Sequence, residues 1–565
     1  MKLERKPVRG AVVASLVTLL LGFLYFYFTL PAINIHNLDA YIFVGILLIV
    51  WCSLYAMFSH SVKRTGEKTP KDFLDVDENG NVVRKRYQNK TGKLAIFSMK
   101  IPLAILCVML AVVVIGIVAG LPIFRAKAYS NLLNAEASDF TADIAEISYS
   151  QIPMLDKDAA QVLADRKLGE LSDLVSQFEV TNGTTQINYQ NQPVRVTYLN
   201  YGDAFKWLGN VSKGIPAYII IDMVSQEVTV QRLENGIRYS PSEYFFRDIN
   251  RHLRFQYPTK MFSDVNFEID DSGNPWWVAT VITKTIGLFG GEDVVGAVLV
   301  DAVTGESTYY DVADVPEWVD RVYTAELLMQ QYDYYGSYHN GFINSIFGQR
   351  DVTMTTRGYN YIALNDDVWM YTGVTSVTGD ESNVGFLLVN QRTKDAKFYA
   401  IAGAEEYSAM SSAQGAVQQF GYQATFPLLL NISGQPTYFM ALKDASQLVK
   451  MYAMVNVQQY QVVATGTTLA QCEKNYLELL SQNQIYVAPG VTGEEFTGTI
   501  ADIRSAVMDG NTHYYIRLEG NTWYFTISVS DAPLCAILNV GDRVRLEGAS
   551  TDGELRSAYT VERAE

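Results

Sequence analysis

The chain of 565 residues has few of the side chains that metal sites and catalytic sites most often use. It contains four cysteines and five histidines, and beyond residue 125 the histidines are His252, His339 and His513, far apart in sequence. No CxxC or HxxxH spacing occurs, and neither does a P-loop, a GxSxG elbow or a dinucleotide fingerprint. The sequence therefore predicts no cofactor, no metal site and no identifiable catalytic residue.

Cysteine is also too scarce for a disulfide-rich scaffold. Cys52 and Cys107 fall inside long apolar runs, so only Cys472 and Cys535 remain for a disulfide outside them. Their spacing does not decide whether they pair.

Charge is missing from three long apolar runs at residues 11–30, 41–58 and 101–123. Each run has about the 20 residues that a helix needs to cross the hydrocarbon of a bilayer. They predict a three-helix transmembrane anchor over residues 1–124, with Pro102 in the first turn of the third helix. Charged residues inside spans mark transport pathways, so their absence indicates helices that anchor rather than conduct.

Lysine and arginine are absent from the link at 31–40 but abundant in the link at 59–99. By the positive-inside rule, the N-terminus and the basic loop 59–99 are cytoplasmic. Three crossings then place everything after Arg125 outside the cell. The sequence thus predicts a multi-pass protein of the cell membrane with an extracellular C-terminal domain, an arrangement that suits a Gram-positive envelope.

The charge of the two parts is opposite in sign. Residues 1–127 hold 16 Lys and Arg against 7 Asp and Glu, and the rest of the chain holds 28 against 53, a net charge of −25. Such a field disfavours binding to nucleic acid or to anionic lipid head groups. We expect no nucleic-acid partner.

Two acidic segments resemble parts of calcium sites. Residues 75–80 match the first half of an EF-hand loop, but Arg86 stands where the bidentate glutamate is required. Residues 270–274 could also donate oxygens to calcium. In both places a hairpin turn is the favoured interpretation.

A short pattern recurs four times after Gly214: an apolar strand, an Asp or Asn, a few turn residues and a second strand. The Asp or Asn positions are Asp222, Asp301, Asn390 and Asn456. Asp and Asn side chains accept hydrogen bonds from backbone groups two or three residues further on. The sequence therefore predicts four β-hairpins whose turns are capped by these side chains.

The surrounding segments predict helices packed on small antiparallel sheets, an α+β architecture. The stretch "PWWVATV" followed by "VVGAVLVDAVTGESTYYDV" resembles the PepSY module, best over residues 242–312 and less well over 409–464. That resemblance implies tandem, membrane-tethered modules that bind or inhibit rather than catalyse. Residues 286–291 depart from the pattern as an insertion between strands.

The end of the chain predicts successive short strands separated by glycine-bearing turns. Its phrase "VGDRVRLEG" resembles the strand that enters the last part of an OB-fold barrel. No basic stripe accompanies it, so a small barrel for protein contact or capping is favoured.

These patterns divide the chain into six expected segments. They are the anchor at 1–124, a helical stalk with a first α+β module at 125–235, a PepSY-like module at 236–315, a tyrosine-rich helix with a β module at 316–400, a second PepSY-like module at 401–490 and an OB-like β-barrel at 491–565.

Aromatic side chains provide the candidate partner surface, and they are Tyr332, Tyr335, Tyr338, Trp276 and Trp523. The tyrosines belong to a helix expected from Val315 to about Phe347, where they either line a partner surface or pack the helix onto a sheet.

The leading hypothesis is a non-catalytic, membrane-anchored extracytoplasmic binding or scaffolding protein. Its partner would be a protein or a cell-envelope component. Two alternatives stay open. One is an accessory subunit of a membrane complex, for which Gly116, Ala119 and Gly120 offer a small-residue packing face. The other is a cell-envelope hydrolase.

Overall fold

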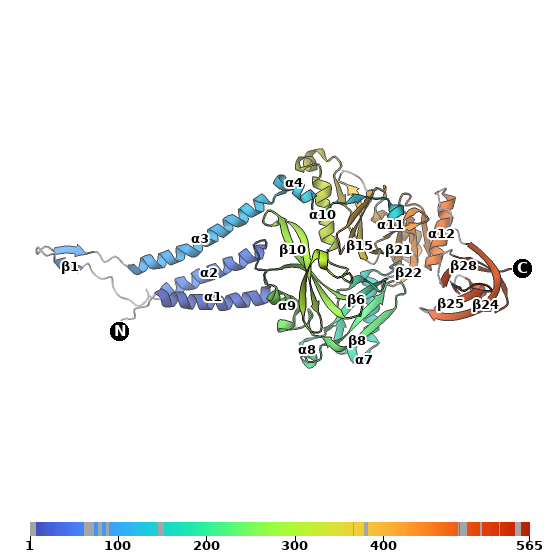
Figure 1. The fold of residues 1–565 in the computed structure, drawn as a ribbon, viewed down its shortest axis with the longest axis horizontal. Helices are drawn as coiled ribbons and strands as arrows, with labels where there is room; N and C mark the ends of the chain where they lie inside the picture. The colour runs from blue at the N-terminus through green and yellow to red at the C-terminus, as the bar shows by residue number, and fades with distance from the viewer. Residues whose placement is uncertain are drawn as a thin grey trace. The chain divides into compact units, whose positions relative to one another are not determined.

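The computed structural model describes residues 7–60, 73–76, 82–85, 90–144, 152–364, 367–377, 382–483, 485, 494–508, 511–529, 532–548 and 555–564 (Figure 1). The chain forms two compact units. The anchor unit comprises Met1–Tyr129, Tyr239–Val265 and Thr280–Val295. The β-rich unit comprises Ser130–Arg238, Asn266–Ala279 and Gly296–Glu565.

Three helices of the anchor unit are long and apolar enough to cross a membrane: α1 (Pro7–Thr29), α2 (Leu38–His60) and α3 (Lys90–Ala119). This confirms the three predicted apolar helices. They pack through small residues: Gly22 of α1 faces Leu47, and Gly45 of α2 faces Leu106. A hydrogen bond of 3.0 Å from Trp51 Nε1 to Ser15 Oγ also joins α1 and α2.

The prediction for Pro102 was wrong. Helix α3 begins at Lys90, so Pro102 lies in its interior and not in its first turn. The apolar run alone set the expected helix start, whereas the helix continues into the polar residues that precede the run. Proline is tolerated inside membrane helices because neighbouring groups satisfy the carbonyl that it leaves unpaired.

The anchor unit also contains shorter elements from later in the chain. Helix α4 (Pro122–Ser130) follows α3, and η2 (Phe245–Arg247) leads into α9 (Ile249–Gln256). Strands β9 (Met261–Ile269), β10 (Pro275–Ile286) and β11 (Gly290–Asp301) contribute residues to both units. In the link between α2 and α3, β1 (Phe73–Val76) pairs antiparallel with β2 (Val82–Lys85), as the hairpin prediction requires. The expected Asn-Gly turn itself lies outside the described residues.

Antiparallel meanders dominate the rest of the chain. The first sheet orders β4-β6-β7-β8, with β5 on β6, from strands Phe178–Val180, Thr185–Tyr189, Gln192–Tyr201, Ile215–Asp222 and Val228–Ile237. Strands β9 to β12 (Ser307–Asp311) form a four-stranded sheet in the order β12-β11-β10-β9.

Two further sheets follow in the β-rich unit. One contains β13 to β18 and also β3 (Glu136–Ala137), which pairs in parallel with β17. The bounds of β13 to β18 are Thr353–Thr355, Asn360–Leu364, Asp367–Ser376, Ser382–Asn390, Ala396–Tyr399 and Gly403–Ala404. The other contains β19 to β23, with bounds Gln423–Ala424, Leu428–Ile432, Gln435–Lys443, Val449–Asn456 and Val463–Gly466. Helices α11 (Glu406–Ala416) and α12 (Leu469–Gln482) bury apolar side chains in one core with this last sheet.

The four predicted turn caps are confirmed. Oδ1 of Asp222 accepts from the backbone N–H groups of the residues two and three positions on, both at 2.8 Å. Asp301, Asn390 and Asn456 accept the same pair of bonds, at 2.7 to 3.1 Å. Each of these residues connects two antiparallel strands.

The last five strands form a closed barrel in the order β24-β25-β26-β28-β27. Their bounds are Glu494–Met508, Asn511–Leu518, Tyr524–Ser528, Leu555–Arg563 and Arg543–Gly548 respectively. Ile500, Phe525 and Leu546 are buried among the side chains of its core. The neighbouring helical turn η6 (Pro533–Ile537) contributes Cys535 to that core.

Asp156 caps α6 (Lys157–Gly169) by accepting from Ala159 N. The tyrosine-rich helix α10 (Ala325–Tyr338) starts ten residues later than expected, because Thr324 and not the Val315 segment provides its cap. Cys472 and Cys535 are both free and buried, so they do not form a disulfide.

Candidate binding site

The candidate partner residues lie on separate elements. On α10, Tyr332 is only 3% exposed and its ring contacts that of Tyr335, while Tyr335 and Tyr338 are half-buried. Trp276 of β10 donates from Nε1 to Asp270 at 3.1 Å. Its ring packs against Trp318 of the segment before α10, with the centroids 5.7 Å apart.

The remaining candidate, Trp523, lies beside the barrel strand β26. The guanidinium carbon of Arg556 lies 4.0 Å from the centroid of its ring. Both tryptophans and Tyr332 therefore have packing partners in their own neighbourhoods, which suits a structural role.

The end of α10 is more exposed. The rings of Tyr334, Tyr338 and Phe342 stack in sequence, with centroids 6.2 Å apart at each step. Beyond them Ile343 is 74% exposed and Phe347 is 83% exposed. This apolar tip lies just beyond the end of α10 and is exposed to solvent within the β-rich unit.

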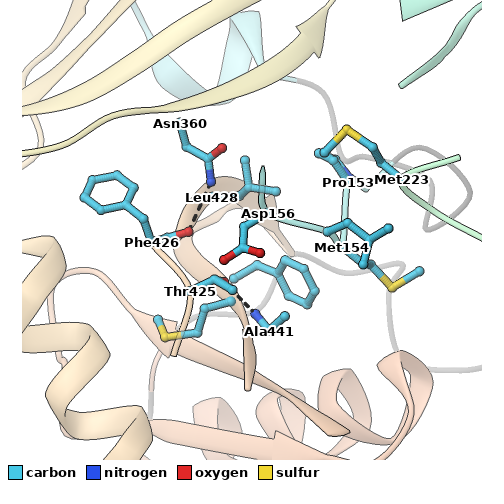
Figure 2. Close-up of a pocket in the computed structure, with 12 residues that line it drawn as sticks. Pro153, Met154, Asp156, Met223, Asn360, Thr425, Phe426, Leu428 and Ala441 are labelled. Atoms are coloured by element: carbon cyan, nitrogen blue, oxygen red, sulfur yellow. Dashed lines mark hydrogen bonds between the residues drawn. The ribbon is translucent and has the colours of Figure 1, made fainter. Parts of the chain in front are cut away.

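A small pocket in the β-rich unit lies between residues 153–156, Asn360 and the strands β20 and β21 (Figure 2). Asn360 Nδ2 donates to Phe426 O at 3.1 Å beside it. The carboxylate of Asp156 pairs with the buried ammonium of Lys443 at 2.5 Å. The pocket has a volume of about 20 Å³, enough for one water molecule and too small for a metabolite.

Two buried acidic residues of the β-rich unit contact each other. Glu268 of β9 is 0% exposed, and its Oε2 accepts from the backbone N of Asp320 at 3.0 Å. Its Oε1 has no hydrogen-bond partner among the described residues. Burial raises the pKa of Glu268 to about 7, partly opposed by that N–H group and by Arg321.

The carboxylate of Asp320, which is 1% exposed, accepts from Asn188 N at 2.6 Å. A hydrolase needs carboxyl groups that a substrate can reach. Because Glu268 and Asp320 are both buried, they do not form such a site in this conformation. They link the strand β5, the strand β9 and the segment before α10.

A larger cavity lies in the anchor unit, at the ends of α1 and α2. We call it the boundary cavity, and its volume is about 390 Å³. Its apolar lining residues include Leu30, Met261 and Ile282. Its polar lining residues are His36, Asn37, Asp39, Arg254 and Lys284.

The link between α1 and α2 forms one wall of the boundary cavity. The backbone N of Ile33 donates to Pro258 O at 2.8 Å, and Asn34 Nδ2 donates to Thr259 O at 2.9 Å. The link is thus bound to the turn between α9 and β9. The ammonium of Lys284, on β10, pairs with Glu292 of β11.

Arg254 is the buried cation of the cavity, only 8% exposed. Its Nε donates to Leu30 O at 2.9 Å, and its Nη1 donates to Lys260 O at 2.5 Å and to Tyr257 O at 3.5 Å. Burial lowers the pKa of Arg254 to about 10. These carbonyls orient the guanidinium but leave its charge without a carboxylate partner among the described residues.

The insertion at residues 286–291 closes the cavity on another side. A Cβ placed on Gly116 of α3 would lie 2.8 Å from Leu288 Cβ and 3.0 Å from Phe289. A Cβ placed on Gly287 would lie 2.9 Å from the N and Cα atoms of Gly120. The chain's own hairpin therefore packs against the glycine positions of α3.

The same hairpin contacts the start of α2. The ring nitrogen Nδ1 of His36 is 2.9 Å from Leu288 O, and the rings of Tyr41 and Phe289 meet edge to face at 5.7 Å. Within the anchor unit, the hairpin thus lies against both α2 and α3.

An aromatic group surrounds the end of α1. Phe255 of α9 packs against Tyr27 and against Phe246, with centroids 6.4 and 5.3 Å apart. The guanidinium carbon of Arg251 lies 4.3 Å from the centroid of the Tyr27 ring. Phe245 and Phe246 are nonetheless 62% and 55% exposed. Aromatic and cationic side chains of this kind gather at the interface between membrane and water.

Known proteins add little to this description. No family model and no curated protein matches the chain. Among solved structures, an ancestral GH74 enzyme matches at 10% identity with a TM-score of 0.16, over 62% of this chain and 42% of that one. A Trypanosoma rangeli sialidase in complex with a difluoro-KDN ligand matches at 9% identity with a TM-score of 0.16, over 68% and 53%. The chain spans about half the length of these proteins, and at such TM-scores neither likeness supports an argument.

Sequence reasoning missed the boundary cavity because its walls come from three distant segments. One signal was present: residues 286–291 are glycine-rich and apolar where the resembled module has no such insertion. Among the described residues, no group of three or more His, Cys, Asp or Glu could hold a metal ion.

Proposed function

We propose that the chain is a membrane-anchored, non-catalytic binding protein that holds a cell-envelope component in the boundary cavity. The observation that supports this proposal is the packing of the anchor unit. The link 30–37, helix α9 and the β10–β11 hairpin meet at the ends of the apolar helices and leave a cavity of about 390 Å³ between them. Ligand sites are typically concave, largely apolar and supplied with a few polar groups.

The location of the cavity follows from loop charge. Because residues 59–99 carry nine Lys and Arg while residues 31–40 carry none, the link between α1 and α2 belongs outside the cytoplasm. The cavity would then open on the outer face of the cell membrane. Its ligand would be an envelope component that approaches from the membrane or from outside.

The β-rich unit would supply the scaffolding part of the function. Helix α11 with the sheet β19 to β23 supports the proposal of a PepSY-like module, as does the recurrence of the same capped turn in four hairpins. The barrel β24 to β28 supports the proposal of an OB-like domain at the end of the chain. The exposed apolar tip beyond α10 is the candidate contact for a protein partner.

The experiment that tests the proposal is the recovery of a bound molecule with the full-length protein. Protein would be purified in mild detergent from its native membrane, and extracted small molecules and lipids would be quantified by mass spectrometry against the amount of protein. Ile282→Trp places a large side chain in the cavity. We expect the wild-type protein to yield a molecule in near-stoichiometric amount and Ile282→Trp to lose at least nine-tenths of it, about tenfold.

Thr283→Trp is the matched control. Thr283 is half-buried like Ile282 and neighbours it on β10, where successive side chains point to opposite faces of the sheet. This variant should retain the molecule. A wild-type protein without any bound molecule, or equal recovery from Ile282→Trp, would contradict the proposed function.

A further inference from the structure

We propose that the boundary cavity binds the phosphate group of a membrane lipid, with the guanidinium of Arg254 as its principal contact. This inference rests on the proposed function, because it names the ligand class of the same cavity. It is carried by the charge of Arg254, which has no carboxylate partner among the described residues, by the position of the cavity and by a lining that holds both polar and apolar residues.

The charge of Arg254 requires a counter-ion. Its partners among the described residues are three backbone carbonyls and the ring of Phe262, whose centroid lies 5.4 Å from the guanidinium carbon. A buried cation with only neutral partners pays a desolvation penalty that an anion would offset. Nε and Nη1 are held by carbonyl groups at 2.9 and 2.5 Å, which fixes the plane of the guanidinium. Nη2 makes no hydrogen bond to a described residue, so this edge of the side chain is the donor that remains for a ligand. Guanidinium groups bind phosphate through such directed, charge-assisted hydrogen bonds.

The position of the cavity favours a lipid over a free ion. Leu30 follows directly on the last residue of α1, and Leu38 is the first residue of α2, so the cavity lies where the apolar helices end. The aromatic group formed by Tyr27, Phe246 and Phe255 lies at the same end of α1. Such groups mark the depth of the lipid head groups.

The lining of the cavity matches the parts of a phospholipid. Arg254 and Lys284 can face a phosphate, while Ile282 and Met261 provide apolar surface for the glycerol and the first acyl carbons. Lys284 already pairs with Glu292, so Arg254 supplies the uncompensated positive charge. The net charge of −25 after residue 127 disfavours a general attraction to anionic membranes. A single buried arginine binds one phosphate group locally and does not depend on that field.

Native mass spectrometry of the full-length protein in detergent tests the inference. The protein would be titrated with phosphatidylglycerol and, separately, with a digalactosyl diacylglycerol of the same acyl chains, which has no phosphate. We expect phosphatidylglycerol to bind at least tenfold more tightly. Millimolar inorganic phosphate should not displace it.

Variants assign the selectivity to one side chain. Arg254→Met should remove the preference for phosphatidylglycerol, and Arg254→Lys should retain part of it. Arg251→Met, one turn away on α9 and absent from the cavity lining, should keep the full preference. A variant that only loosens the cavity would weaken both lipids alike and leave their ratio unchanged, so the ratio separates phosphate binding from a structural role.

Three outcomes would overturn the inference. They are equal binding of the two lipids by the wild-type protein, an unchanged ratio in Arg254→Met, and full displacement by inorganic phosphate, which would indicate a site for a free anion. Any of these leaves the proposed function standing if a molecule still occupies the cavity. Absence of every bound molecule would instead contradict the proposed function itself.

Discussion

At the scale of single residues, the carboxyl group of Glu268 shows how burial alters one side chain. It lies on β9 with no exposed surface, and one of its oxygens has no hydrogen-bond partner among the described residues. Burial raises its pKa from 4.5 in the unfolded chain to about 7 in the fold. The protonated form is therefore favoured in the folded protein, and the contribution of Glu268 to stability is complete below pH 4.5. That contribution is lost as the pH rises to about 7.

The loss of stability on ionisation of Glu268 gives a prediction for Glu268→Gln. The amide stays neutral at every pH, so the variant should match the wild type near pH 4.5 and be more stable at pH 8, by at most about 3 kcal/mol. Thermal unfolding of the full-length protein in detergent at both pH values measures the difference. Glu317→Gln, at an exposed position, is the control for replacing a glutamate by glutamine outside the core. A constant difference between Glu268→Gln and wild type would show that Glu268 does not titrate in this range.

At the scale of elements, the capping residues of the four hairpins can be compared with one another. Two of the caps are aspartates and two are asparagines, which indicates that the acceptor oxygen matters and the charge does not. Asp301→Ala removes two hydrogen bonds, to Val303 N and Thr304 N, and should destabilise the β11–β12 turn by about 1 kcal/mol.

The matched control for this turn is Asp301→Asn, which should have little effect because asparagine occupies the same place at Asn390. Hydrogen exchange of the backbone amides at residues 303 and 304 reports on the turn directly and does not require two-state unfolding of a large protein. Equal protection in Asp301→Ala and wild type would show that the cap contributes nothing to the turn.

A second prediction at this scale concerns the hairpin that lies on α3. Glycine to alanine inside a helix normally stabilises it by about 0.5–1 kcal/mol. Gly45→Ala should follow that rule, because the new Cβ would lie an ordinary 3.6 Å from Leu106. Gly116→Ala should destabilise the protein instead, because its Cβ would lie 2.8 Å from Leu288 Cβ.

Leu288→Gly removes the Cβ that the new methyl group of Gly116→Ala would crowd. The two substitutions should therefore be less than additive, with a coupling of about 1 kcal/mol in a double-mutant cycle of thermal stability. Additive effects would show that the hairpin does not pack on α3 in the membrane protein as purified.

These elements also show what the sequence could predict. The three spans and the four caps depend on residues within one run or one turn, so a local pattern was enough. Gly116, Ala119 and Gly120 were predicted to offer a packing face to another membrane subunit, whereas the hairpin that lies near Gly116 and Gly120 comes about 170 residues further along the chain. The boundary cavity was missed for the same reason, since Leu30, Arg254 and Ile282 meet only after folding. A sequence pattern identifies a packing surface more easily than it identifies the segment that packs against that surface.

At the scale of the whole molecule, orientation in the membrane is the property that decides which components the protein can meet. We expect a cysteine introduced at Asp271, an exposed turn position, to react with a membrane-impermeant maleimide on intact cells. A cysteine introduced at Lys68, in the basic loop, should react only after the membrane is permeabilised.

The native thiols should not interfere with this measurement. Cys472 and Cys535 are buried, and burial raises their pKa values to about 12 and about 11, so little reactive thiolate exists near neutral pH. Cys52 and Cys107 lie within the apolar helices α2 and α3. Reaction at position 68 in intact cells together with protection at 271 would reverse the orientation and place the β-rich unit in the cytoplasm.

The β10–β11 hairpin packs on α3 but is synthesised after it, because it lies further along the chain. Gly120 leaves the ribosome about 170 residues before Gly290, which at 5–20 residues per second is a delay on the order of 10–30 s. Through that interval α3 is already made while its glycine face has no hairpin to cover it. The nascent protein therefore has a period in which a chaperone, a lipid or a neighbouring helix can occupy this face before the hairpin packs on it.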